Sequence, residues 1–414
     1  MQNSQQPSQR RFTFFSTIDV PILVVMVLLV AIGCLMIYST TFDWSYQDFG
    51  SDTVIFMQHV RNLFVGTAVF AVVLIIDYRV WRRIAIPILL ITIATLIAVL
   101  LFGDGVFGAR RAFLNGSYQP GEVAELTVVI YLAAWLSSKR TRVSSILNGL
   151  LPFAILLGII GTLVLLQPDL STAATIFVTA GIMFFLAGAN VMHLGSVLAL
   201  MGVSGWVVSQ RLNYAQGRVS SYIAGLTDLT QTNYHAQQAI IAFINGGWTG
   251  RGLGQSLQKF GALPTPHTDS IFAVIGEELG VLGAGFVILL YVVLVIRGLQ
   301  IARRSSDPFG ALLASGVTLW IITKALLNIA VMLNLVPSTG VALPFISFGG
   351  SSLVTVMAGT ALVLSVARVT ALQYSPEARK AKSIARDDRS RGDGRSRLPG
   401  NSRRRSPVHP SAGR

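Results

Sequence analysis

The chain has 414 residues, of which 52% are hydrophobic and only 12% are charged. Soluble domains carry about 25% charged residues, so this composition excludes an ordinary soluble protein. Apolar runs recur along the chain and are continuous rather than alternating, which favours membrane-spanning helices over a β-barrel. The single cysteine, Cys34, lies inside the first run, which excludes a disulfide framework within the chain.

The apolar runs predict an all-α polytopic integral membrane protein. Ten spans are expected, at residues 19–39, 58–77, 84–101, 122–137, 148–166, 172–187, 191–209, 271–297, 310–334 and 350–371. The fourth and sixth runs are short for a bilayer of about 30 Å. The first follows Arg10 and Arg11 and lacks a small-residue cleavage site, which indicates a retained span rather than a signal peptide.

Basic residues near the span ends predict the orientation. If ten spans alternate, three basic connections fall on the same side as both termini, which is then cytoplasmic. These connections carry Arg79, Arg82 and Arg83; Lys139, Arg140 and Arg142; and Arg297, Arg303 and Arg304. The outer side then holds the 40–57, 102–121 and 335–349 loops and a long loop, 210–270, between the seventh and eighth spans.

Three segments follow from this layout: a cytoplasmic N-terminal segment (1–18), a transmembrane domain (19–372) and a basic tail (373–414). From residue 376 onward the tail has twelve Lys and Arg against four Asp and Glu, out of a net charge of +14. The tail also contains almost no apolar residues, and this composition predicts disorder. A basic segment after a last span more often meets anionic lipid headgroups than nucleic acid, so we expect membrane lipids and no nucleic acid as its partner.

The stretch "PTPHTDSIFAVIGEELG", 264–280, places three acids at and just inside the edge of an apolar span. Asp269 follows a proline-rich approach that contains His267. It is either a functional acid facing outward or a cap for the helix that follows. Glu277 and Glu278 lie about two turns into the span, where they line a polar cavity or bind arginines of the long loop.

Other charges near the predicted outer side are candidates for the same site. Asp169 ends the fifth span after Pro168, and Glu122 starts the fourth. Arg218, Arg251 and Lys259 lie in the long loop. The alternative for these groups is structural ion pairing, because charges in membrane domains usually find partners.

No sequence motif indicates a resident cofactor or metal. The five histidines show no metal-ligand spacing, and the glycine-rich "GGWTGRGLG", 246–254, lacks the context of a phosphate loop. A divalent cation therefore stays an open question.

Four strings resemble the SEDS family of bacterial cell-wall synthesis, the FtsW/RodA proteins. They are "QPGEVAEL" (119–126), "LLQPDLSTA" (165–173), "YHAQQAIIAFINGGWTGRGLGQSLQKFGALPTPHTDSIFAVIGEELGVLG" (234–283) and "NLVPSTGVALPFISFGGSSL" (334–353). The similarity covers about residues 19 to 372 and leans toward the division-associated FtsW type.

The resemblance implies a peptidoglycan glycosyltransferase of the bacterial plasma membrane that polymerises lipid II on the extracytoplasmic side. Asp269 matches the family's essential aspartate in "HTDFIFA", although Ser270 replaces the phenylalanine. The resemblance also makes Ser347 and Ser351 candidates for binding substrate. The chain departs from the family elsewhere: Glu125 stands for a lysine, Gly121 for a serine, Ser171 for a glycine and Ala112 for a tryptophan.

The chemistry expected for this activity is an inverting transfer with Asp269 as general base. Arg218, Arg251 and Lys259 are the candidates to offset charge on the departing pyrophosphate. A class B penicillin-binding transpeptidase is the implied partner, with other division or elongation proteins. Two alternatives stay open: a lipid II flippase, and a non-catalytic scaffold for division proteins.

Overall fold

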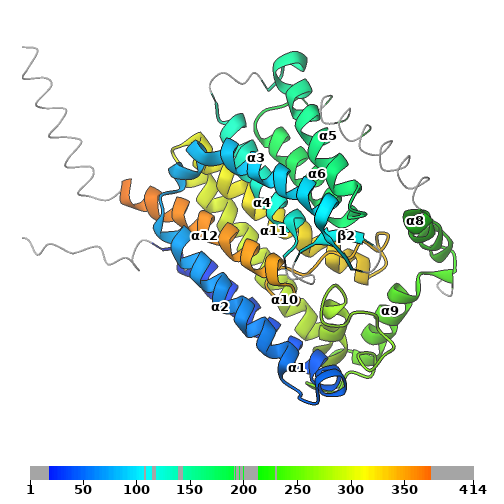
Figure 1. Cartoon of the computed structure of the whole chain (residues 1–414). Helices are drawn as coiled ribbons and strands as arrows, with labels where there is room; N and C mark the ends of the chain where they lie inside the picture. The colour runs from blue at the N-terminus through cyan, green and yellow to red at the C-terminus, as the bar shows by residue number, and fades with distance from the viewer. Residues whose placement is uncertain are drawn as a thin grey trace, which may run out of the picture. The chain divides into compact units, whose positions relative to one another are not determined.

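A computed structural model describes residues 18–106, 109–113, 118–138, 143–190, 213–228 and 231–373, with single positions at 192, 195 and 199. The described chain is almost entirely helical (Figure 1). Its helices are α1 (Val20–Phe49), α2 (Val54–Ile75), α3 (Tyr78–Phe102), α4 (Pro120–Leu136), η2 (Ile146–Leu150) continuing into α5 (Leu151–Leu165), α6 (Leu170–Leu186), α8 (Asn213–Gly225), α9 (Tyr234–Gly246), α10 (Ile271–Arg304), α11 (Pro308–Met332) and α12 (Gly350–Gln373).

The predicted helical architecture is confirmed. In the described residues, seven helices are long and apolar enough to cross a membrane, and α6 is a shorter apolar helix. Both α4 and α6 have 17 residues, in agreement with the short fourth and sixth runs. The predicted seventh span, 191–209, lies almost wholly outside the described residues, as do the N-terminal segment and the basic tail.

The predicted loops contain regular structure that the hydropathy pattern did not show. The 102–121 loop forms a small antiparallel pair of strands, β1 (Asp104–Val106) and β2 (Ala109–Ala112). The long 210–270 loop contains α8 and α9, which Figure 1 shows outside the group of long helices. Neither helix is long enough to span a bilayer.

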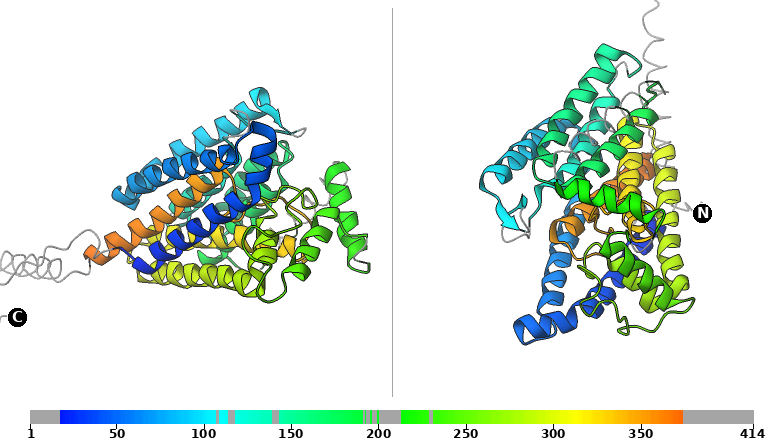
Figure 2. Two further views of the ribbon diagram at one scale, coloured as in Figure 1. Left: turned by 90° about the horizontal axis from the view of Figure 1, so that it is seen from below. Right: turned by 90° about the vertical axis from the view of Figure 1, so that its right-hand side faces the viewer.

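The long helices run roughly side by side (Figure 2). Helix α10 packs against α1, α9 and α11, and α11 packs against α4 and α6. The most apolar windows of α11 and α12 are 67% and 78% buried within the protein, compared with 28% for α2 and α3. The outer helices therefore present apolar side chains to lipid, while the inner helices α11 and α12 can carry polar groups among other helices.

The connections between the described helices gather at two ends of the group. At the end with the basic connections, Arg297 pairs with Asp19 at 2.6 Å, and Ser365 donates a hydrogen bond to the carbonyl of Ile76 at 2.8 Å. At the other end, Ser347 donates to the carbonyl of Thr268 at 2.6 Å. The basic group at 139–142 lies outside the described residues.

Helix α10 is broken at Gly280, which has φ 69° and ψ −171°. Almost no residue other than glycine adopts this conformation. The amides that follow the break bond to the loop after α9: Val281 donates to the carbonyl of Gly247 at 2.9 Å and Leu282 to that of Trp248 at 3.2 Å. Residues 271–279 are therefore a separate short helix, which corrects the expectation that Glu277 and Glu278 lie within a continuous span.

The break predicts a strong effect of substitution at Gly280. A Cβ there would overlap the amide nitrogen of Gly250 and the carbonyl oxygen of Trp248. Together with the backbone strain, this should make Gly280→Ala less stable by at least about 2 kcal/mol. Thermal unfolding in detergent is the measurement. Gly285→Ala is the control, because no atom lies within 4 Å of a Cβ at that position; equal melting temperatures for the two variants would contradict the analysis.

Candidate active site

A cavity of about 640 Å³ lies among the ends of α4, α6, α11 and α12 and the segments 265–269 and 339–342. Six of the residues predicted for a functional site line it: Asp269, Arg218, His267, Glu122, Asp169 and Ser351. They come from positions 122 to 351, so the fold brings together groups that are far apart in the sequence.

Asp269 is half-buried at this cavity and is held by hydroxyl groups on one side only. Its Oδ1 accepts hydrogen bonds from the hydroxyls of Thr265, at 2.5 Å, and Thr268, at 3.0 Å. Its Oδ2 accepts none from the part of the chain that the structure describes. Helix α10 begins after Ser270 without a side-chain cap, so Asp269 does not cap this helix and that alternative is wrong. The carboxylate is therefore positioned by its neighbours through one oxygen only.

Two side chains from other segments fix the backbone around Asp269. Asn328 of α11 donates to the carbonyls of Asp269 and Val341, both at 2.7 Å. Ser347 bonds to the carbonyl of Thr268 and accepts from the amide of Leu343 at 2.8 Å. Ser347 thus lies behind the cavity wall rather than on it. Sequence reasoning missed Asn328, although an amide inside an apolar span was a usable signal.

Burial disfavours the charged form of the two histidines near Asp269. Burial lowers the pKa of His267 to about 4, although the negative charge of Asp269 acts in the opposite direction. Burial also lowers the pKa of His235, which bonds to the hydroxyl of Ser270. The ring of His267 packs between Trp44, with centroids 4.9 Å apart, and Phe348, at 5.7 Å. His267 therefore shapes the cavity and does not supply a positive charge.

Lys324 supplies a charge that sequence reasoning missed. Its ammonium group, on α11, bonds to Glu122 and to Glu125, the latter at 2.8 Å. Glu125 also accepts from the indole of Trp320 at 2.9 Å. The lysine stands alone inside the predicted 310–334 span, and charge at such a position is the signal that would have found it. Ion pairing is thus the observed role of Glu122, and Glu125 has its own cationic partner where the family resemblance would place a lysine.

Asp169 lines the same cavity and caps α6. It accepts hydrogen bonds from the amide of Thr172 at 3.0 Å and from the hydroxyls of Thr172 and Ser171 at 2.8 and 2.6 Å. Ser171 is one of the departures from the family pattern, and its hydroxyl is used here as a donor to this carboxylate. These bonds match the usual arrangement of an N-capping aspartate.

Besides Ser347, three predicted substrate-binding residues do not line the cavity. Arg251 is exposed in the loop after α9. The ammonium of Lys259 is buried and paired with Glu278 at 2.9 Å. Glu277 is fully buried and accepts hydrogen bonds from Asn245, at 3.3 Å, and from the 256–258 segment. The expectation that these acids bind loop arginines is therefore corrected: the cation is Lys259, and the other donors are amides and hydroxyls.

Small residues at the start of α12 also belong to the cavity. Gly349, Gly350, Ser351 and Ser352 line it together with Gly340. Ser351 accepts a hydrogen bond from the amide of Gln119 at 3.2 Å, which joins this segment to the start of α4. Among the described residues, no three His, Cys, Asp or Glu side chains come together in a geometry that would hold a metal ion.

Comparison with known proteins identifies the family. A family described as "Cell cycle protein", which groups FtsW, RodA and SpoVE, matches residues 20–372. The chain belongs to this family. It is 34% identical to a probable peptidoglycan glycosyltransferase FtsW of Geobacter metallireducens, over 84% of this chain and 94% of the relative. It is 35% identical to stage V sporulation protein E of Bacillus subtilis, over 84% and 97% of the two chains.

Solved structures agree with this assignment. A chain from a study of "structural coordination of polymerization and crosslinking by a peptidoglycan synthase complex" matches with a TM-score of 0.70 and 25% identity, over 85% of this chain and 98% of that one. The rod shape determining protein RodA of Thermus thermophilus matches with a TM-score of 0.62 and 25% identity, over 85% and 97%. Our chain is therefore a multi-pass bacterial membrane protein of the FtsW/RodA family.

The buried group formed by Lys324, Glu122 and Glu125 predicts a compensated double substitution. Lys324→Met leaves two carboxylates without their cation and should lower the free energy of unfolding by about 3–5 kcal/mol. Adding Glu125→Gln removes one of these charges and should recover part of the loss. Thermal unfolding of the single and double variants in detergent measures both effects. A double variant less stable than Lys324→Met would show that the pairing does not stabilise the fold.

Proposed function

We propose that this protein is a peptidoglycan glycosyltransferase that polymerises lipid II, with Asp269 as the general base. The observation that carries the proposal is the free Oδ2 of Asp269 at a cavity that also contains Arg218. The printed names of its relatives support the activity. They favour it over transport of lipid II and over a purely non-catalytic scaffold.

The reaction needs little apparatus beyond this acid. The 4-hydroxyl of a GlcNAc unit attacks C1 of a MurNAc unit, and the bond from C1 to the pyrophosphate oxygen breaks. The hydroxyl proton passes to Oδ2 of Asp269, and the pyrophosphate leaves with the bonding electron pair. A base positioned for such a proton contributes about 10²–10⁴-fold. A single displacement inverts the configuration at C1, which agrees with one acting carboxylate.

Arg218 is the cation best placed to assist the leaving group. It lines the cavity from α8, and its guanidinium donates to the carbonyl of Ser338 at 2.9 Å. Lys324 also lines the cavity but is already bound by Glu122 and Glu125. A fixed guanidinium stabilises negative charge that develops on phosphate oxygens. We therefore assign the pyrophosphate to the Arg218 side of the cavity.

The site is proposed to face the extracytoplasmic side. The basic connections at the opposite ends of the helices support this orientation through the positive-inside rule. The lipid chains of the substrate would then stay in the bilayer while the sugars reach Asp269 at its outer edge.

A class B penicillin-binding transpeptidase is the proposed partner. The chain shows no SxxK motif with a downstream KTG on its predicted outer side, so the peptide cross-links require another protein. The synthase complex that this fold resembles combines polymerization and crosslinking. Gly349 and Gly350 line the cavity, so they are not free to form part of the surface for this partner.

Asp269→Asn should reduce polymerisation of labelled lipid II by at least about 10²-fold, because the amide cannot accept the proton. The variant should melt at the temperature of the unmodified protein, since Thr265 and Thr268 can still bond to the amide oxygen. Asp48→Asn is the matched control, because Asp48 is exposed and does not line the cavity. Polymerisation at a normal rate by Asp269→Asn would rule out the assignment of the base.

Arg218→Ala should lower kcat/KM for lipid II about ten- to a hundredfold, the effect expected for one lost charge-assisted hydrogen bond. Arg251→Ala should change it less than about twofold, because Arg251 is exposed and outside the cavity. Steady-state kinetics and thermal unfolding are measured for both variants. Together they separate a loss of lipid II binding or turnover from a loss of protein stability. Equal losses of activity in the two variants would contradict a specific role for Arg218.

A further inference from the structure

The C-terminal part of α1 extends about ten residues beyond its predicted span, to Phe49. At 1.5 Å per residue this adds about 15 Å of helix. The added turns have the sequence "TTFDWSYQDF" and carry exposed aromatic rings: Trp44 is 44% and Tyr46 is 64% exposed. Trp44 contacts His267 at the cavity, whereas Tyr46 projects beyond the core.

Two further hollows follow this part of α1 away from the Asp269 cavity. The first, of about 470 Å³, lies between α1 and the segment 259–266, and it shares Trp44 and Thr265 with the cavity. The second, of about 450 Å³, lies at the turn after α1 and shares Phe42 and Asp43 with the first. Thr265 itself bonds to Asp269. The three hollows are therefore neighbours along α1, in a row whose first member contains the proposed base.

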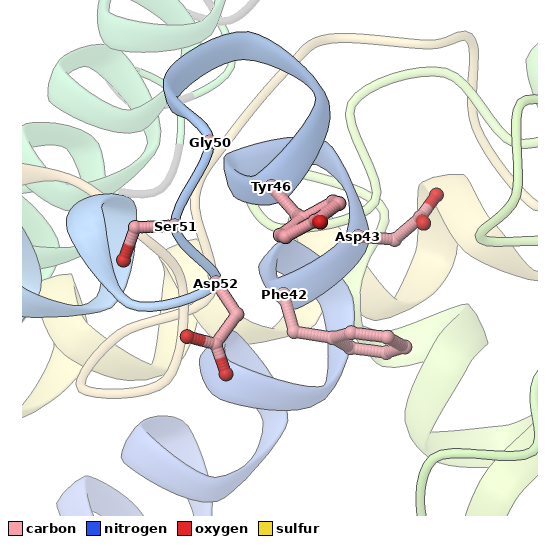
Figure 3. A pocket seen from close by; sticks show the side chains of 6 residues that line it. All are labelled: Phe42, Asp43, Tyr46, Gly50, Ser51 and Asp52. Atoms are coloured by element: carbon pink, nitrogen blue, oxygen red, sulfur yellow. The ribbon is translucent and has the colours of Figure 1, made fainter.

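The lining of the row combines aromatic rings with uncharged and acidic hydrogen-bonding groups. In the first hollow, Phe42 and Phe260 meet edge to face with centroids 6.2 Å apart, and Gln47 donates to Asp43 at 2.7 Å. In the second, Phe42, Asp43 and Tyr46 project from α1 and Asp52 projects from the turn (Figure 3). Amphipathic rings with a few oriented polar groups suit a ligand that has both an apolar face and hydroxyls. A pyranose ring has this surface.

The charge of the row disfavours a pyrophosphate. Lys259 lines the first hollow, but its ammonium is bound by Glu278, by Ser39 at 3.1 Å and by the carbonyl of Gly254 at 2.8 Å. Asp43 and Asp52 add negative charge further along. A phosphate would be repelled there, whereas sugar hydroxyls can donate to these carboxylates. The row and the Arg218 side of the cavity thus differ in the ligand that each accepts.

We propose that this row, from Trp44 to Asp52, is an extended saccharide-binding track that holds sugar units adjacent to the two being joined. The assignment rests on the proposed glycosyltransferase function. A polymerase benefits from such a track because it keeps the strand bound between successive additions. The sugar units belong either to the growing strand or to the incoming disaccharide, and the experiment distinguishes the two.

The test uses Asp43→Ala and Tyr46→Ala in the full-length protein, with Phe49→Ala as the matched control. Phe49 lies on the same part of α1 and is 57% exposed, but it lines none of the three hollows. Labelled lipid II is polymerised, and both product length and KM are measured. Shorter products with an unchanged KM for lipid II would place the growing strand in the track. A raised KM with unchanged length would place the incoming disaccharide there. Either result supports saccharide binding.

Binding of a lipid-free peptidoglycan tetrasaccharide gives a second measurement that needs no catalysis. Binding is measured in protein that carries Asp269→Asn. The result therefore does not depend on whether Asp269 is the general base. Asp43→Ala in this background should weaken binding about tenfold, the effect of one hydrogen bond to a charged group. Unchanged binding, length and KM in both variants would overturn the proposal. Equal effects of Phe49→Ala would also overturn it, because they would show that the rings on α1 act only as anchors at the membrane interface.

Discussion

The two buried carboxylates that follow Asp269 hold together the segment on which the site is built. Glu277 and Glu278 are 0% and 1% exposed, and they collect donors from the 254–259 segment. Buried carboxylates are tolerated only when such donors satisfy them. The break of α10 at Gly280 places both acids opposite this segment, and the same segment leads directly to Asp269. The position of the proposed base therefore depends on a polar core that has no part in the chemistry.

The acids near the predicted outer edge differ in how many of their carboxylate oxygens already accept hydrogen bonds or pair with a cation. Glu122 and Glu125 share Lys324, and Asp169 is occupied by the start of α6. Of these four carboxylates that line the cavity, Asp269 differs from the rest. Its Oδ1 accepts hydrogen bonds from two hydroxyls, and its Oδ2 accepts none from the described residues. Satisfied carboxylates stabilise the walls, whereas a half-satisfied one can accept a proton from a bound hydroxyl. Residue type alone does not make this distinction; the partners do.

Much of the membrane domain could be predicted because hydropathy is a local property of the chain. The run at 310–334 predicted α11 to within two residues at each end. Asp269 became the candidate base from its place at a span edge and from its motif, and the structure places it at the cavity. The cations were harder to assign. Arg218, Arg251 and Lys259 all lie in one loop, but α8 and α9 turn Arg218 toward the cavity, leave Arg251 exposed and bury Lys259. The different positions of these three side chains depend on contacts between residues far apart in the sequence, which a local sequence pattern does not predict. Lys324 and Asn328 were different: each was a visible polar residue inside an apolar run.

Helix α1 is longer than a bilayer crossing requires, so it can extend from the lipid into water. A span of about 20 residues is sufficient to cross the bilayer, yet α1 continues to Phe49 and ends in Gly50 at φ 72°. The helical backbone satisfies its own hydrogen bonds on both sides of the membrane edge, so one rigid element can pass from lipid to water without a break. It packs against α10, and its last part borders the segment that carries Asp269. A lipid-linked substrate has the same two phases, since its chains must stay in the bilayer while its sugars extend from it.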